Sequence, residues 1–298
     1  MNEGPLVSIV IPTYNHGHLM KRCLKSVTEQ TFRNWEAIII NNHSDDNTVE
    51  VVKGFNDQRI HLINFHNDGI IAASRNEGIR RSKGQYVAFL DSDDWWHPKK
   101  LELAVKYLRN ADVVFHDLEI STPKERRILK KIRGRRLHKP IFVDLMSMGN
   151  ALSNSSVVAR KDIIESVGGL SEDKSLVASE DFDLWLRMSR VTERFHYIPQ
   201  SLGTYWMGNE NVSTISEKGI ARIEAVYDRH IGFLSGEDRQ QAEIFKSYLI
   251  GRIMQKLGLD DDALKFYKIA IRIKNIEYKL RTVCCILCLF YNRVLAKK

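Results

Sequence analysis

In the first half of this 298-residue chain, short apolar segments alternate with segments of helical periodicity. This alternation limits the fold more than any other feature, because strands that alternate with helices form βαβ units and a mostly parallel sheet. Polar residues at the carboxyl ends of such strands usually bind the ligand. We expect strands at 7–12, 37–41, 60–65, 86–91 and 113–116, with helices near 19–28, 48–55, 70–82 and 98–109.

The second half has a different pattern. Residues 118–150 break the alternation, after which a strand is expected at 156–160 and helices at 162–167 and 180–191. Beyond residue 208 we expect only helices. The sequence therefore predicts an α/β domain over 1–208 and a helical region over 209–298. The helices of this second region are expected at 222–234, 237–256, 261–273 and 277–294.

Acidic residues directly follow the fourth predicted strand. Asp91 and Asp93 lie two positions apart at the strand end. Carboxylates placed in this way can hold a hard cation such as Mg²⁺ or Mn²⁺ together with its phosphate ligands. The alternative is an acidic turn that only precedes the helix near 98–109.

Two further candidates lie on predicted helices. Asp181 follows Glu180 at the start of a helix, where a carboxylate is either stabilised by the helix dipole or acts as a general base. Arg75 is either a phosphate ligand or an ordinary solvated arginine. The chain has no G-x-G-x-x-G, P-loop or G-x-S-x-G motif. Their absence excludes the commonest dinucleotide-binding, NTPase and hydrolase classes.

The formal net charge of +8 is unevenly distributed. Residues 124–139 and 265–298 each carry nine Lys and Arg against one acid, so the remainder is net acidic. The first patch has no aromatic residue for stacking on bases, and no nucleic-acid partner is expected. Segments 124–139 and 275–298 instead suit an anionic membrane surface. The alternatives are a solvated loop for the first and a packed helical hairpin for the second.

The N-terminus has no basic region and no small-residue cleavage site, and its apolar run at 6–12 is short and typical of a strand, so no signal peptide is expected. No stretch reaches the ~20 apolar residues that span a bilayer. The four cysteines are too few for a disulfide scaffold. Three of them cluster at 284, 285 and 288 but lack the further ligands of a zinc site. We expect a cytoplasmic protein that is peripheral on the inner face of the cytoplasmic membrane.

Taken together and in order, these segments resemble the bacterial family 2 inverting glycosyltransferases, which have the GT-A fold, a Rossmann-like nucleotide-diphospho-sugar transferase fold. The resemblance covers about two-thirds of the chain and combines an opening Pro-Thr-Tyr-Asn, an Arg-Asn helix, an Asp-x-Asp and a later Glu-Asp helix. The matching segments are 7–15, 24–40, 41–48, 72–102, 153–173 and 179–189.

The resemblance implies an inverting, metal-dependent sugar transfer from a nucleoside-diphosphate sugar to a glycan or lipid-linked hydroxyl in cell-surface polysaccharide synthesis. Asp181 would be the general base, with Glu180 beside it at the acceptor. Asp93, helped by Asp94, would bind Mn²⁺ or Mg²⁺. The nucleotide and donor would contact the remaining implied residues, which are Pro12, Thr13, Tyr14, Asn15, Asn42, Arg75, Asp91 and Ser92.

The chain departs from the family pattern at two places. Asn41-Asn42 stands where the family usually has Asp-Asp, and an Asp there helps to bind uracil. Asn42 keeps a carbonyl acceptor but adds a donor, so a UDP-sugar is expected while cytidine and guanosine nucleotides stay open. Many relatives carry a late histidine near the metal, but residues 205–209 contain none, so we name no third protein ligand for the metal. The alternative function is a non-catalytic sugar-nucleotide-binding scaffold with the same fold.

Overall fold

The computed structural model describes residues 4, 6–123, 130–208 and 216–295, with side chains described as far as Tyr291. Parts of the two basic segments, residues 124–129 and 292–298, therefore lie outside the described side chains. The chain divides into two compact units, residues 1–138 with 151–211 and residues 139–150 with 212–298. The expected domain boundary after residue 208 stays a prediction.

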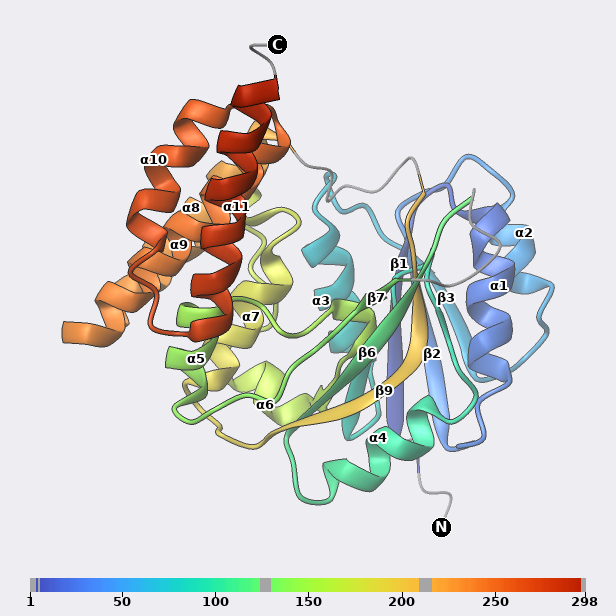
Figure 1. Cartoon of the computed structure of the whole chain (residues 1–298). Coiled ribbons are helices and arrows are strands. Elements are labelled where there is room, and N and C mark those ends of the chain that lie inside the picture. Colours follow the sequence, from blue (N-terminus) through green and yellow to red (C-terminus); the bar gives the residue numbers. More distant parts are fainter. Residues whose placement is uncertain (1–3, 5, 124–129, 209–215, 296–298) are drawn as a thin grey trace. The chain divides into compact units, whose positions relative to one another are not determined.

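The first unit is built on one mixed sheet with the order β3-β2-β1-β4-β8-β6-β9-β5, and β7 pairs with β6 (Figure 1). Strands β3, β2, β1 and β4 are mutually parallel, whereas β8 pairs antiparallel with both β4 and β6. The strands are β1 Val7–Thr13, β2 Trp35–Asn41, β3 Ile60–Asn64, β4 Tyr86–Phe89, β5 Trp95–Trp96, β6 Val113–Ser121, β7 Lys131–Ile132, β8 Val158–Arg160 and β9 Phe195–Trp206.

Helices cover both faces of this sheet, which explains why every residue of β1 and β2 is buried. One face of β1 joins a core cluster with α1, α2 and α4. Gly78 of α3 packs on the other face, where a Cβ atom would lie 2.5 Å from Val10. The helices of this unit are α1 Gly17–Thr28, α2 Thr48–Lys53, α3 Ile71–Arg81, α4 Lys100–Leu108, α6 Lys161–Ser166 and α7 Glu180–Ser189.

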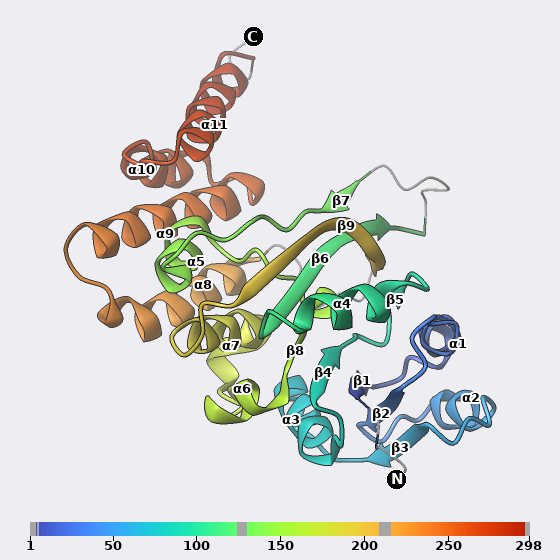
Figure 2. The ribbon, with the colours of Figure 1, turned by 90° about the horizontal axis from the view of Figure 1, so that it is seen from below.

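The predicted α/β fold is confirmed, including the parallel N-terminal strands. Strand β9, which lies beside β6 along its whole length (Figure 2), was not predicted from the sequence. This strand contains Pro199, mixes buried, half-buried and exposed residues without regular alternation, and shifts its register against β6 near His116. Irregular alternation of this kind hides a strand from a periodicity test.

The second unit consists of helices with a core of their own. Tyr227 donates a hydrogen bond to the carbonyl of Met146 at 2.9 Å, and Tyr267 is completely buried. The helices are α5 Ile141–Met148, α8 Glu217–His230, α9 Gly236–Lys256, α10 Asp260–Ala270 and α11 Ile276–Leu295. Across the described part of the chain, no helix combines the length and apolar character needed to cross a membrane.

Candidate active site

The loops that follow β1 and β2 are joined by hydrogen bonds. The amide of Asn15 donates to Oγ of Ser44 at 2.9 Å, and the amide of Asp45 donates to Oδ1 of Asn15 at 2.8 Å. Asn15 has a φ of 50°, in the left-handed region that asparagine tolerates better than most residues. Asp46 accepts from the amide of Gly17 at 2.8 Å at the start of α1. The two loops therefore form one rigid edge of the sheet.

Asn42 lies at this edge beside residues 12–14. Its amide donates to the carbonyl of Thr13 at 3.0 Å, while its side-chain Oδ1 accepts from the amide of Asn67 at 3.1 Å. That contact fixes the orientation of the side chain and leaves the second lone pair of the oxygen for a ligand. Pro12 and Thr13 are buried, whereas the ring of Tyr14 is 52% exposed. The exposed ring can stack on a flat base.

A buried arginine joins three distant parts of the first unit. Arg75 of α3 donates from Nη2 to Oδ1 of Asp91 at 2.7 Å and from Nη1 to Oε1 of Glu180 at 2.5 Å. Asn154 also donates to Oδ1 of Asp91, at 2.9 Å. Burial lowers the pKa of Arg75, but its attraction to Asp91 and Glu180 outweighs burial and raises the pKa overall. The guanidinium is therefore a permanent positive charge at this sheet edge.

Asp93 and Asp94 follow Asp91 in a desolvated loop. Asp94 is buried, and its Oδ1 accepts from the amide of Trp206 at 2.8 Å, whereas its buried Oδ2 has no hydrogen-bond partner within the described residues. Burial raises the pKa of Asp93 to about 7, with a further contribution from the charge of Asp91. Burial also raises the pKa of Asp94. A divalent cation would relieve this crowding of carboxylates, so the donor set fits Mg²⁺ or Mn²⁺.

The described side chains alone do not complete such a site. Among the described side chains, no group of three or more His, Cys, Asp and Glu could hold a metal ion. One or two carboxylates completed by phosphate oxygens is the arrangement that Mg²⁺ commonly adopts. The geometry therefore fits a metal that binds together with a diphosphate.

Asp181 occupies the first turn of α7 beside the Arg75 network. Burial and, to a smaller extent, the charge of Glu180 raise the pKa of Asp181 to about 7, although the charge of Arg75 acts in the opposite direction. Its Oδ1 accepts from the amide of Phe182 at 2.7 Å. A carboxylate with a pKa near neutrality can take up a proton at physiological pH, as a general base must.

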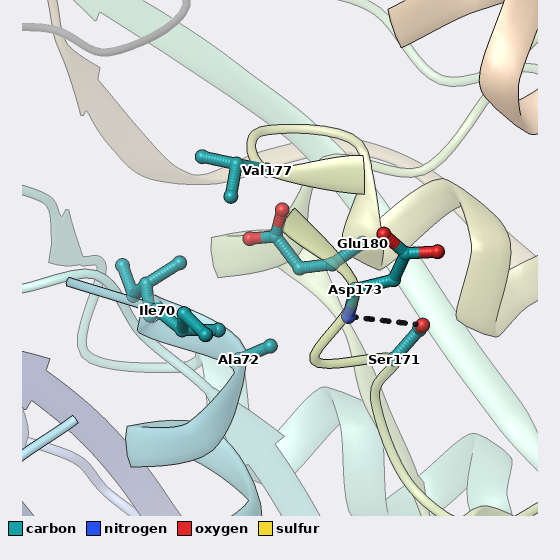
Figure 3. A pocket seen from close by; sticks show the side chains of 7 residues that line it. Ile70, Ala72, Ser171, Asp173, Val177 and Glu180 are labelled. Atoms are coloured by element: carbon teal, nitrogen blue, oxygen red, sulfur yellow. Dashed lines mark hydrogen bonds between the residues drawn. The ribbon is translucent and has the colours of Figure 1, made fainter. Parts of the chain in front are cut away.

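Glu180 also faces a small hollow between α3 and the segment before α7. Figure 3 shows its carboxylate pointing into the space between Ile70 and Val177. Its Oε2 is buried and has no hydrogen-bond partner within the part of the chain described. The hollow is lined by Ile70, Ile71, Ala72, Ser171, Asp173, Val177 and Glu180.

Three contacts at this edge were not foreseen from the sequence. Ser155 accepts from the amide of Asp91 at 3.1 Å, next to the contact of Asn154 described above. Oγ of Ser92 lies 2.7 Å from Nδ1 of His16, so this contact joins the loop after β4 to the loop after β1. A polar Ser-Asn-Ser-Ser at residues 153–156, buried before a strand, was the only available signal for Asn154 and Ser155.

The third is Arg22 of α1, which lies between two indole rings. Its guanidinium carbon is 3.7 Å from the ring centre of Trp95 and 4.6 Å from that of Trp206. Its Nη2 donates to the carbonyl of Asp93 at 2.9 Å. Burial lowers the pKa of Arg22, and the nearby Asp94 and Asp93 act in the opposite direction. Arg22 of α1 therefore holds the backbone of the Asp93 loop in place.

Replacing Arg22 by Gln is expected to raise the KM for the donor about tenfold, because the loop loses a charge-assisted hydrogen bond and a stacked cation. Arg22→Lys should have a KM between those of the wild type and Arg22→Gln, because lysine keeps the charge but cannot stack as a planar group on the indole rings. Steady-state kinetics at saturating metal would measure both. Lys25→Gln on the exposed side of the same helix is the matched control, and equal KM values for Arg22→Gln and that control would contradict the expectation.

Comparison with known proteins identifies the family. Residues 8–158 match the family model described as glycosyl transferase family 2. The chain is 27% identical over 230 residues to the Bacillus subtilis protein named "Putative teichuronic acid biosynthesis glycosyltransferase TuaG", covering 76% of this chain and 88% of the relative. It is 37% identical over 110 residues to the Escherichia coli UDP-Glc:alpha-D-GlcNAc-diphosphoundecaprenol beta-1,3-glucosyltransferase WfgD, covering 37% of this chain but only 44% of that relative.

A solved structure supports the fold over the whole chain. The mannosyltransferase PcManGT of Pyrobaculum calidifontis, in complex with GDP-Man and Mn²⁺, superposes with a TM-score of 0.63 at 16% identity. The match covers 100% of this chain and 82% of that one. At this level of identity the likeness concerns the fold, which is the predicted GT-A fold.

Proposed function

This chain belongs to glycosyl transferase family 2, and we propose that it is a metal-dependent, inverting glycosyltransferase that moves a sugar from a nucleoside-diphosphate sugar to the hydroxyl of a lipid-linked or glycan acceptor. The observation that carries the proposal is the Arg75–Asp91–Glu180 network. It places a permanent cation beside the Asp93 loop and beside a carboxyl, Asp181, whose pKa is near neutral.

The nucleotide would bind at the edge formed by the loops after β1 and β2. The exposed ring of Tyr14 would stack on the base, and Asn42, held by Asn67, would bind its edge. Uridine is the first expectation, because the name of WfgD includes a UDP-sugar donor. A guanosine nucleotide is the second expectation. The side-chain amide of Asn42 can both donate and accept hydrogen bonds, and PcManGT is in complex with GDP-Man.

The diphosphate would lie between Arg75 and the Asp93 loop. Asp93 would bind Mn²⁺ or Mg²⁺, with Asp94 as support and Arg22 fixing the loop. When bound, the cation would stabilise the charge that develops on the leaving diphosphate. Asp91, oriented by Arg75 and Asn154, would accept a hydrogen bond from the ribose.

Asp181 would take the proton from the acceptor hydroxyl as the new glycosidic bond forms and the bond to the diphosphate breaks. A single base on the face opposite the leaving group gives one in-line displacement and inverts the anomeric carbon. Glu180 would hold Arg75 through Oε1 and present its unpartnered Oε2 to the acceptor side.

We propose a lipid-linked acceptor at an anionic membrane surface, within the synthesis of a cell-surface polysaccharide. The name of WfgD includes a diphosphoundecaprenol acceptor, and that of TuaG includes teichuronic acid biosynthesis. Such an acceptor lies in a bilayer, so the enzyme would have to work at its surface. The basic segments 124–139 and 275–298 are the candidates for this contact.

Thermal-shift titration with UDP-sugars and GDP-sugars, with and without Mn²⁺, would test the donor and metal together. We expect the melting temperature to rise only when a donor sugar nucleotide and Mn²⁺ are both present. The part of this rise that depends on Mn²⁺ should vanish in Asp93→Asn, because the metal loses a carboxylate ligand. Asp68→Asn, an exposed carboxylate at 77%, is the control. Stabilisation without any hydrolysis or transfer would favour the non-catalytic scaffold, and no stabilisation by any donor would overturn the proposal.

A further inference from the structure

Helix α11 is apolar on two opposite faces. Its inner face buries Thr282, Cys285 and Leu289, which recur three and four residues apart and belong to the core of the second unit. Its outer face exposes the side chains of Ile276, Leu280, Leu287, Phe290 and Tyr291, each at least half accessible. An ordinary surface helix has one apolar face and one polar face. The outer face of α11 therefore requires another explanation.

The exposed residues form a continuous stripe. A helix turns by about 100° per residue, so Ile276, Leu280, Leu287 and Tyr291 fall within an arc of about 60°. Phe290 widens the arc to about 100°. Single exposed apolar residues are common on proteins, whereas a contiguous patch of large ones usually marks an interaction surface. We call these five residues the α11 stripe.

Positive charge borders the α11 stripe. Lys279 lies on one side of it and Arg281 on the other, both exposed, while the single acid of the helix, Glu277, is paired with Arg281 at 2.6 Å. Lys268 and Arg272, also exposed, lie just before the helix. The described border of the stripe is thus net positive. An apolar face with a cationic border matches the boundary between anionic headgroups and acyl chains.

The same charges argue against the main alternative occupant, a second copy of the chain. Two copies that paired through their α11 stripes would bring like charges together along the border, which disfavours association. An anionic lipid surface instead lowers the energy of both the cations and the apolar side chains. The helix is also too polar to cross a bilayer, which fits a helix that lies on the surface.

We propose that the α11 stripe inserts into the interface of an anionic membrane and holds the enzyme at the leaflet that contains its acceptor. This membrane contact rests on the function proposed above, whereas the α11 stripe and its charged border are observed independently of the site chemistry. The proposal also assigns the contact to particular side chains rather than to the basic composition of the whole segment 275–298.

Co-sedimentation with phosphatidylcholine vesicles, with and without about one-third phosphatidylglycerol, would test this. We expect the wild type to bind the anionic vesicles and Leu280→Glu with Leu287→Glu to bind at least tenfold more weakly. Lys279→Gln with Arg281→Gln should weaken only the anionic binding. Val191→Glu, an equally exposed apolar site of the first unit at 54%, is the matched control. Circular dichroism would show that each variant is folded.

Two results would overturn the proposal: no binding of the wild type to anionic vesicles, or equal binding by the Leu280→Glu, Leu287→Glu variant and the control. A stripe variant that changed only the molar mass in solution would show that a second copy covers the stripe. Donor hydrolysis measured without vesicles separates the two proposals. If hydrolysis is absent but vesicle binding follows the stripe, the proposed function fails and the membrane contact stands.

Discussion

Asp181→Asn is expected to lower kcat for sugar transfer by about 10²- to 10⁴-fold, the usual contribution of a general base. The amide cannot accept the acceptor proton, but it has nearly the same size and still accepts from the amide of Phe182. The nucleotide contacts lie on other loops, so donor affinity should change little. Stopped assays with excess donor and acceptor would give kcat, and calorimetry would give the donor affinity.

The pH dependence of the wild type follows from the same carboxyl. The base must be ionised to act, and its pKa is about 7 in the ligand-free protein. The value of kcat/KM should therefore rise with pH below about 7 and level off above it. A rate that is already pH-independent at pH 5 would contradict the assignment of Asp181 as the base.

The stability of the fold tests the same pKa in a second way, because stability should fall with rising pH where kcat/KM rises. The unfolded chain releases the Asp181 proton near pH 4 and the folded protein near pH 7, so between these values the unfolded state binds fewer protons. Ionisation of Asp181 thus destabilises the fold as pH rises through this window. Asp181→Asn should gain thermal stability relative to the wild type between pH 5 and pH 8. Asp162→Asn, an exposed carboxyl in the first turn of α6, should show no such gain.

The elements that the sequence predicted best are those in which one physical signal dominates. Strands β1 and β2 are uninterrupted apolar runs because both of their faces are covered by helices. The carboxyl ends of parallel strands meet at one edge of the sheet, so the loops after β1, β2 and β4 were expected to lie together. The contacts of Asn15 with Ser44 and of His16 with Ser92 join these three loops. Strand β9 was missed because it mixes exposed and buried residues and includes a proline.

The contacts inside the site could not be predicted in the same way. Arg75 and Glu180 are 105 residues apart, and nothing in local periodicity indicates that they meet. The position of Arg22 between two indoles depends on the pairing of β5 with β9, the strand that was missed. Motifs therefore identified which residue types matter at the sheet edge, while the tertiary fold determined their partners.

Arg75→Met is expected to destabilise the protein by about 3–5 kcal/mol, because it leaves buried carboxylates without a counter-charge. The side chain of Glu180 is 6% exposed and that of Asp91 is 26% exposed. Water can therefore solvate the unpaired charge of Glu180 poorly and that of Asp91 only in part. Arg80→Gln removes an exposed ion pair with Glu77 and should cost less than about 1 kcal/mol. Urea unfolding of both variants would measure the difference, and similar losses would mean that the Arg75 network contributes little to stability.

A double variant separates the structural effect of Arg75 from its effect on the donor. Arg75→Met with Glu180→Met removes the buried cation together with Glu180, the more buried of its two counter-charges, and leaves only the partly exposed Asp91. Apolar residues of similar volume often replace a buried ion pair at little cost. We expect stability to recover by at least half of the loss in the single variant. Donor affinity should stay low, because a diphosphate still lacks its cation. Recovery of both properties would show that Arg75 only supports the fold, whereas recovery of stability alone would assign it to the diphosphate.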